Sequence, residues 1–263
     1  MSEPCLTFRP VVLVTVLKPC AHIAGLVKAI SDANLPVILV EESHDNATKL
    51  ACEQCVGAGV TLIPRDHLNG ISEATTVGFK AAHGLGYTHV LQLRAERHRD
   101  FDGALTLIHT AAHYPSSVVC SVQTQAGVHR HLNNLLSNFD ALTFSIPSAQ
   151  SDVRVTPVSA FLQLIERKRL TQSVDFDTDV LIRLIWMGLR VKTVSIPVST
   201  LAAKRTQRPL ETLGLHARLM LTMVTRFPFI ALLRMTGWQP RQYIRSQPHY
   251  AQSKEGMNKT LNK

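Results

Sequence analysis

The sequence predicts an α/β fold in which a mostly parallel sheet is flanked by helices on both faces. Short apolar runs rich in Val, Ile and Leu alternate with amphipathic stretches from residue 9 to residue 123. Several of these runs have no polar interruption, which is typical of parallel strands that are buried on both faces. Clusters of charged residues follow the runs directly, at the position where open α/β sheets bind ligands.

The first half of the chain supplies most of the sheet and its helices. Apolar or β-branched runs predict strands at residues 9–17, 35–43, 60–65, 87–93 and 116–123. Apolar residues at helical spacing predict the intervening helices at residues 21–34, 46–59, 69–86 and 102–115. Because right-handed crossovers place the carboxyl ends of parallel strands along one edge, we expect the charged segments 41–45, 66–70 and 94–102 to meet there.

The regular alternation stops after residue 123. The second half predicts a helix at residues 126–144, a loop leading to a short strand at 145–157, helices at 158–170 and 176–189, and a strand at 190–198. Residues 201–240 are basic and apolar and predict an amphipathic helical extension, whereas the polar residues 241–263 predict a disordered tail. We therefore expect one domain over residues 8–200, followed by the extension.

The charge balance favours an anionic partner. The chain of 263 residues has 28 Lys and Arg against 19 Asp and Glu, a formal net charge of +9. Arginines recur among Leu, Met, Phe and Trp238 from residue 205 to residue 245, the pattern of a segment lying on an anionic membrane surface. The same pattern also fits helices that pack on the domain or on a partner chain. No known nucleic-acid-binding motif is present and only 6% of residues are aromatic, so we expect no nucleic acid partner.

The five cysteines favour a reducing, cytoplasmic setting, because they are odd in number and scattered. The first residues do not have the pattern of a signal peptide, and no run reaches the ~20 apolar residues of a membrane span. Cys52 and Cys55 form a single Cys-x-x-Cys on a predicted helix. A zinc site needs further ligands, so we expect two partly buried thiols here.

Four stretches carry motifs in a recognisable order: VILVEESHDNAT at residues 37–48, HLNGISEATTVGFKAA at 67–82, HVLQLRAERHRDFDGAL at 89–105 and DFDTDVLIRLIWMGLRVKTVSIPV at 175–198. They resemble glycosyltransferase family 2, and in particular the bacterial proteins related to polyprenyl-phosphate sugar transferases. The corresponding family segments are a strand ending in two Asp, an Asn-x-Gly segment with a small-residue helix, a strand ending in Asp-x-Asp, and a late Phe-Asp-x-Glu helix. SDVRVTP is a weaker match to a further segment.

This resemblance implies a GT-A fold with a Rossmann-type sheet. It also implies transfer of a sugar from a nucleotide-sugar donor to a lipid-linked or hydrophobic acceptor. Together with the basic extension, it predicts a cytoplasmic protein that is peripheral on the inner membrane. The alternative is a catalytically inactive relative that keeps the fold and acts as a binding or scaffold protein at the membrane.

The resemblance also implies roles for residues at matching positions. Glu41 and Glu42 replace the paired Asp, and Arg94-Ala95-Glu96 stands in the place of Asp-x-Asp. The implied donor-binding residues are Glu41, Glu42, Asn69, Gly70 and Glu96.

The remaining implied roles concern the transfer step itself. Arg94 and Arg97 would stabilise the leaving group, Asp179 would act as base and Arg154 would contact an acceptor phosphate. Two simpler expectations stay open: an i,i+4 ion pair between Asp179 and Arg183, and an exposed Arg154 with no special role.

A divalent metal, Mg²⁺ or Mn²⁺, is the cofactor that the resemblance implies, because it would neutralise the diphosphate leaving group. Glu96 is its candidate ligand. Arg94 is expected to pair with Glu96 and to repel a cation, so the degenerate motif weakens the site. Three hypotheses remain: metal-dependent transfer, metal-free transfer in which arginines bind the diphosphate, and loss of catalysis.

Overall fold

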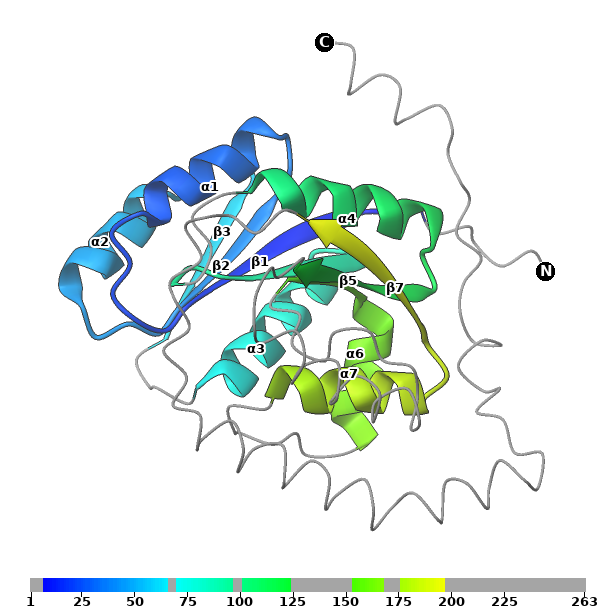
Figure 1. Ribbon diagram of the computed structural model, residues 1–263. Helices are drawn as coiled ribbons and strands as arrows, with labels where there is room; N and C mark the ends of the chain where they lie inside the picture. The colour runs from blue at the N-terminus through cyan, green and yellow to red at the C-terminus, as the bar shows by residue number, and fades with distance from the viewer. Residues whose placement is uncertain (1–6, 66–69, 97–100, 124–152, 168–175, 197–263) are drawn as a thin grey trace, which may run out of the picture.

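The fold is a seven-stranded sheet between two layers of helices, as the computed structural model shows (Figure 1). The structure describes residues 7–65, 70–96, 101–123, 153–167 and 176–196. The sheet has the strand order β3-β2-β1-β4-β6-β5-β7. Its strands are β1 (Pro10–Val16), β2 (Val37–Glu41), β3 (Val60–Pro64), β4 (His89–Arg94), β5 (Ser117–Gln123), β6 (Arg154–Pro157) and β7 (Arg190–Ile196).

One strand runs against the others. β6 pairs antiparallel with β4 on one side and with β5 on the other, whereas the remaining neighbours pair in parallel. The prediction of a mostly parallel sheet is therefore confirmed. As a consequence, the first residue of β6 lies at the edge where the parallel strands end.

The helices divide between the two faces of the sheet (Figure 1). α1 (Ile23–Asp32), α2 (Asn46–Gln54) and α4 (Asp102–His113) cover one face. α3 (Ile71–Gly84), α6 (Val158–Arg167) and α7 (Phe176–Trp186) cover the other. Helices predicted from periodicity are thus found in the described part of the chain, with somewhat shorter bounds. No helix in that part is long and apolar enough to cross a membrane.

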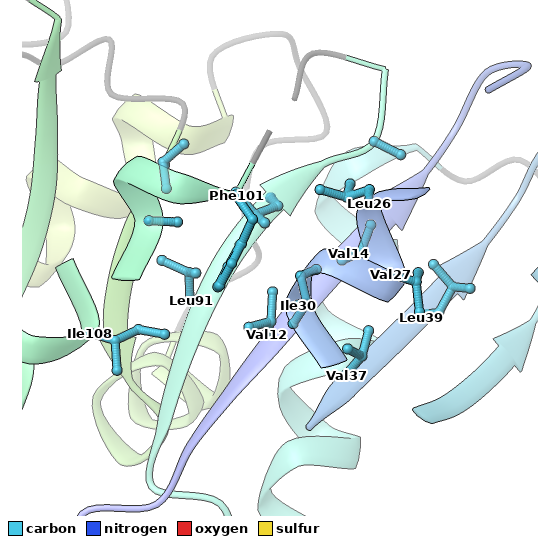
Figure 2. Close-up of a cluster of buried hydrophobic side chains, with 14 of the residues drawn as sticks. Val12, Val14, Leu26, Val27, Ile30, Val37, Leu39, Leu91, Phe101 and Ile108 are labelled. Atoms are coloured by element: carbon cyan, nitrogen blue, oxygen red, sulfur yellow. The ribbon is translucent and has the colours of Figure 1, made fainter. Parts of the chain in front are cut away.

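Each face of the sheet has its own core, and β1 contributes to both. Val12 and Val14 point into the cluster beneath α1 and α4, which Figure 2 shows together with Leu26, Leu91 and Phe101. The intervening β1 residues, such as Leu13, are buried in the other cluster. There the rings of Phe79 (α3) and Phe161 (α6) stack with their centroids 3.9 Å apart. This burial on both sides explains why β1 is an uninterrupted apolar run.

Some predictions fall outside the described residues. These are the helix at 126–144, the basic extension at 201–240 and the tail at 241–263. The domain bounds of 8–200 therefore stay a prediction.

Gly78 of α3 packs against Leu13 of β1, and this contact generates a stability prediction. A Cβ atom at Gly78 would stand 2.3 Å from Cδ1 of Leu13, which is fully buried. We expect Gly78→Ala to lower the free energy of unfolding by about 1–3 kcal/mol through overpacking, as measured by urea denaturation. Gly25→Ala in α1 is the matched control, because a Cβ there meets no atom within 4 Å. It should raise stability by about 0.5–1 kcal/mol, and equal effects of the two changes would contradict this packing.

His89 at the start of β4 predicts a pH dependence of stability. The ring is fully buried, and its Nε2 donates to the carbonyl oxygen of Pro115 at 2.8 Å, so Nδ1 is the acceptor for Thr88 Oγ1 at 3.0 Å. Burial lowers the pKa of His89 from 6.5 to about 4.

The unfolded chain therefore binds a proton at this histidine before the folded protein does. The free energy of unfolding should fall as the pH drops from about 6.5 to about 4, by up to about 1.4 kcal/mol per pH unit. Denaturation series of the wild type and His89→Gln isolate this contribution from that of other histidines. Parallel pH profiles for the two proteins would rule it out.

Candidate functional site

The carboxyl edge of the sheet brings together charged residues from distant parts of the chain. Val16 at the end of β1 aligns with Glu41 of β2, and Thr15 aligns with Arg94 of β4. Arg154 at the start of β6 aligns with Gln92 of β4. The strand ends therefore place predicted site residues along one edge, as expected from the topology.

Asp177 is the centre of an ion-pair cluster at this edge. Nη2 of Arg94 donates to Oδ2 of Asp177, and Nη2 of Arg154 donates to Oδ1 at 2.8 Å. Asp177 belongs to the first turn of α7, so its carboxylate joins that helix to β4 and β6. We call these three residues the Arg94–Asp177–Arg154 cluster.

Arg154 is the most deeply buried member of the cluster, with 2% of its surface exposed. Besides Asp177, its Nε donates to Oε1 of Gln92 at 2.7 Å, and its Nη1 donates to the backbone carbonyl of Asp177. The expectation of an exposed arginine is therefore wrong. Contact with an acceptor phosphate stays a prediction, and the burial of Arg154 argues for a supporting role instead.

The expected pairing of Arg94 also needs correction. Arg94 pairs with Asp177, 83 residues further along the chain, rather than with Glu96. The start of α7 lies against the ends of β4 and β6. The carboxylate of Asp177 is therefore within hydrogen-bonding distance of the Arg94 guanidinium.

Glu96 follows β4 on a backbone that is held from two sides. The N–H of Ala95 donates to the carbonyl of Thr15 at 3.0 Å, and the carbonyl of Ala95 accepts from Nε2 of His22 at 2.7 Å. Oε2 of Glu96 is buried and has no hydrogen-bond partner among the described residues. A buried acceptor without a partner is costly, so this oxygen is suited to receive a donor from a ligand.

The two acids that end β2 have partners within the protein. Oε1 of Glu41 accepts from the backbone N–H of Ser43 at 2.6 Å. The Glu42 side chain is fully buried and lies 2.8 Å from Nε of Arg65, which also pairs with Glu73 of α3. Their roles in donor binding stay predictions, and the burial of Glu42 favours a structural role for that residue.

Asp179 forms the predicted ion pair. Its Oδ1 lies 2.7 Å from Nε of Arg183, one turn further along α7. The pair confirms the simpler expectation for this residue, whereas the role of Asp179 as base stays a prediction.

Of the remaining candidates, Gly70 is described and Asn69 and Arg97 lie outside the described residues. Gly70 is the N-cap of α3 with a φ of 81°, a backbone conformation that favours glycine. This conformation explains a glycine at the start of α3 without any contact to a ligand.

The thiols of the Cys-x-x-Cys pair are buried or partly buried, as predicted. Burial, followed by the negative charge of Glu41, raises the pKa of Cys52 to about 12. Burial also raises the pKa of Cys55. Neither thiol is thus poised to form the thiolate that a metal or a redox reaction requires.

The described residues at this edge do not fit a bound divalent metal. Arginines occupy both carboxylate oxygens of Asp177, and Arg183 pairs with Asp179. Within the described segments, no group of three or more His, Cys, Asp or Glu could hold a metal ion. Glu96 remains as a single candidate ligand beside a cluster with more cations than anions.

The chain matches no protein-family model and no curated protein. It is similar in structure to glucosyl-3-phosphoglycerate synthase from Mycobacterium tuberculosis in complex with Mn²⁺, UDP and phosphoglyceric acid. That similarity has a TM-score of 0.61 and 14% identity, and it covers 83% of this chain and 78% of the other.

The same enzyme with Mn²⁺, UDP-glucose and glycerol 3-phosphate gives a TM-score of 0.60 and 16% identity, over 83% of this chain and 79% of the other. A structure described only as a mycobacterial protein gives 0.57 and 14%, over 81% and 73%. At these identities the similarity establishes the fold, and the predicted GT-A-like α/β fold is confirmed. These neighbours do not test the relation to polyprenyl-phosphate sugar transferases.

The two Arg–Asp pairs of α7 give a matched stability prediction. Arg154→Met removes a buried cation from Asp177 and Gln92 and should lower the free energy of unfolding by roughly 3–5 kcal/mol. Arg183→Met removes the i,i+4 partner of Asp179 and should cost about 0.5 kcal/mol or less. Urea denaturation measures both changes. A small, equal cost for the two variants would show that Arg154 does not anchor α7.

Proposed function

We propose that the protein is a divergent glycosyltransferase that transfers a sugar from a nucleotide-sugar donor. The observation that carries this proposal is the contact of Arg94 with Asp177, which brings the first turn of α7 with Asp179 to the carboxyl edge of a GT-A-like sheet, where Glu96 follows β4. Ligands bind at this edge in open α/β folds. The similar synthase binds UDP-glucose and phosphoglyceric acid, which supports a nucleotide-sugar donor for this chain.

Each residue in the proposal has a defined part. The buried oxygen of Glu96 accepts a hydrogen bond from the nucleotide sugar. The Arg94–Asp177–Arg154 cluster stabilises the negative charge of the leaving diphosphate. Asp179 takes the proton from the acceptor hydroxyl when its pair with Arg183 opens. Arg97, outside the described residues, adds to the charge that faces the diphosphate.

The acceptor in this proposal is a lipid-linked or otherwise hydrophobic molecule at the cytoplasmic face of the inner membrane. The arginines and apolar residues between positions 205 and 245 support it, because such a segment binds anionic lipid surfaces. The similar synthase was crystallised with phosphoglyceric acid, and a phosphate-bearing acceptor also suits the arginines at this edge.

A catalytically inactive binding or scaffold protein is the second candidate. This alternative is favoured because residues at the positions that resemble the family motifs form ion pairs within the protein. Arg94 and Asp177 pair with each other, and Glu42 pairs with Arg65. These contacts hold the fold together whether or not a substrate binds.

Donor binding is the first property to measure. We expect one UDP- or GDP-sugar to raise the melting temperature, because a ligand at about 100 times its Kd adds about 2.7 kcal/mol to the free energy of unfolding. Glu96→Gln should reduce this shift. Glu53→Gln on the exposed surface of α2 is the matched control and should leave it unchanged.

A transfer assay then separates the enzyme from the scaffold. With a donor that binds and a long-chain alkyl glycoside as a hydrophobic acceptor with a free hydroxyl, Asp179→Asn should lower the transfer rate by about 10²–10⁴-fold while the thermal shift persists. A folded protein that binds no donor, or that binds one without any turnover, would favour the scaffold.

A further inference from the structure

The Arg94–Asp177–Arg154 cluster places a fixed positive charge at the end of β4. Two guanidinium groups share one carboxylate, so the cluster carries a net charge of +1. The side chains of Arg94 and Arg154 are 12% and 3% exposed, respectively, and charges this well shielded are screened less by salt than surface charges. These three residues therefore contribute one positive charge to the end of β4.

Arg154 occupies one carboxylate oxygen of Asp177 and keeps that carboxylate in place. It binds the Asp177 carboxylate and the Asp177 backbone carbonyl, and Gln92 holds its Nε. Moving Asp177 toward a metal ion would leave Arg154 buried without its counter-charge, at a high energetic cost. Arg154 is thus a positioning residue, because it fixes the carboxylate that in turn holds Arg94.

A divalent ion at the same place would compete with Arg94. Such ions bind through one or two carboxylates together with substrate phosphates. Here Asp177 is occupied on both oxygens, and Glu96, two residues after Arg94, is a single remaining carboxylate among the described residues that directly follow β4. Arginine, by contrast, matches the geometry of phosphate oxygens without a metal.

We propose that the Arg94 guanidinium, held by Asp177, takes the position and the electrostatic role of a divalent cation at the end of β4. A nucleoside diphosphate therefore binds at this edge without a metal. The nature of the ligand rests on the proposed function, whereas the placement of the cation rests on the cluster alone. The experiment below separates the two.

Binding of Mn²⁺ by itself tests the placement of the cation. Isothermal titration with MnCl₂ on the full chain should show no binding to the wild type at millimolar concentration. Arg94→Asp should gain affinity by at least about tenfold, because it removes the cation, frees Oδ2 of Asp177 and adds a carboxylate at the end of β4. Arg183→Asp makes the same substitution beside Asp179 and is the matched control, for which we expect no gain.

Binding of UDP to the wild type tests whether a nucleoside diphosphate binds without a metal, and this comparison does not require a variant that folds. The Kd measured in EDTA and in Mn²⁺ should agree within about threefold. Arg94→Gln should weaken binding in EDTA by about tenfold or more, whereas Lys192→Gln on β7 should not.

Binding of Mn²⁺ to the wild type in the absence of nucleotide would overturn the inference. So would an increase of about tenfold or more in UDP affinity on addition of Mn²⁺, or a folded Arg94→Asp variant whose Mn²⁺ affinity does not rise. A wild type that binds neither UDP nor Mn²⁺, together with an Arg94→Asp variant that gains Mn²⁺, would reject donor binding. It would uphold the placement of the cation.

Discussion

The contact of two arginines with one carboxylate organises the edge of the sheet where the site residues meet. Arg154 is buried and requires a counter-charge, and Asp177 supplies it from the first turn of α7. The same carboxylate holds Arg94 at the end of β4. This interaction therefore connects the first turn of α7, which also contains Asp179, to β4 and β6.

Other contacts along the edge follow the same principle of internal pairing. Arg65 lies between Glu42 and Glu73 and so connects the ends of β2 and β3 to α3. His22 binds the carbonyl of Ala95 and connects the segment after β1 to the end of β4. Such contacts keep the edge in one arrangement in the absence of a substrate, and preorganised charge of this kind is what stabilises a developing anion.

The fold and the individual residues of the site determine different properties. The GT-A-like sheet brings charged residues together at its carboxyl edge, but a fold by itself does not specify a reaction. The chemistry depends on the individual residues, and here an arginine stands where the resembling family has an acid. In the proposed site a guanidinium, rather than a metal, is the source of positive charge.

Local patterns in the sequence determined the strands and helices of the described segments, because hydrophobic periodicity reports which faces of an element are buried. The pair between Asp179 and Arg183 was predictable for the same reason, since residues four apart on a helix are neighbours. Only the tertiary structure decided the antiparallel insertion of β6 between β4 and β5, the burial of Arg154 and the choice of Asp177 as partner of Arg94. These features join segments up to 83 residues apart. Spacing along the chain does not indicate which of several distant acidic side chains will pair with a given arginine.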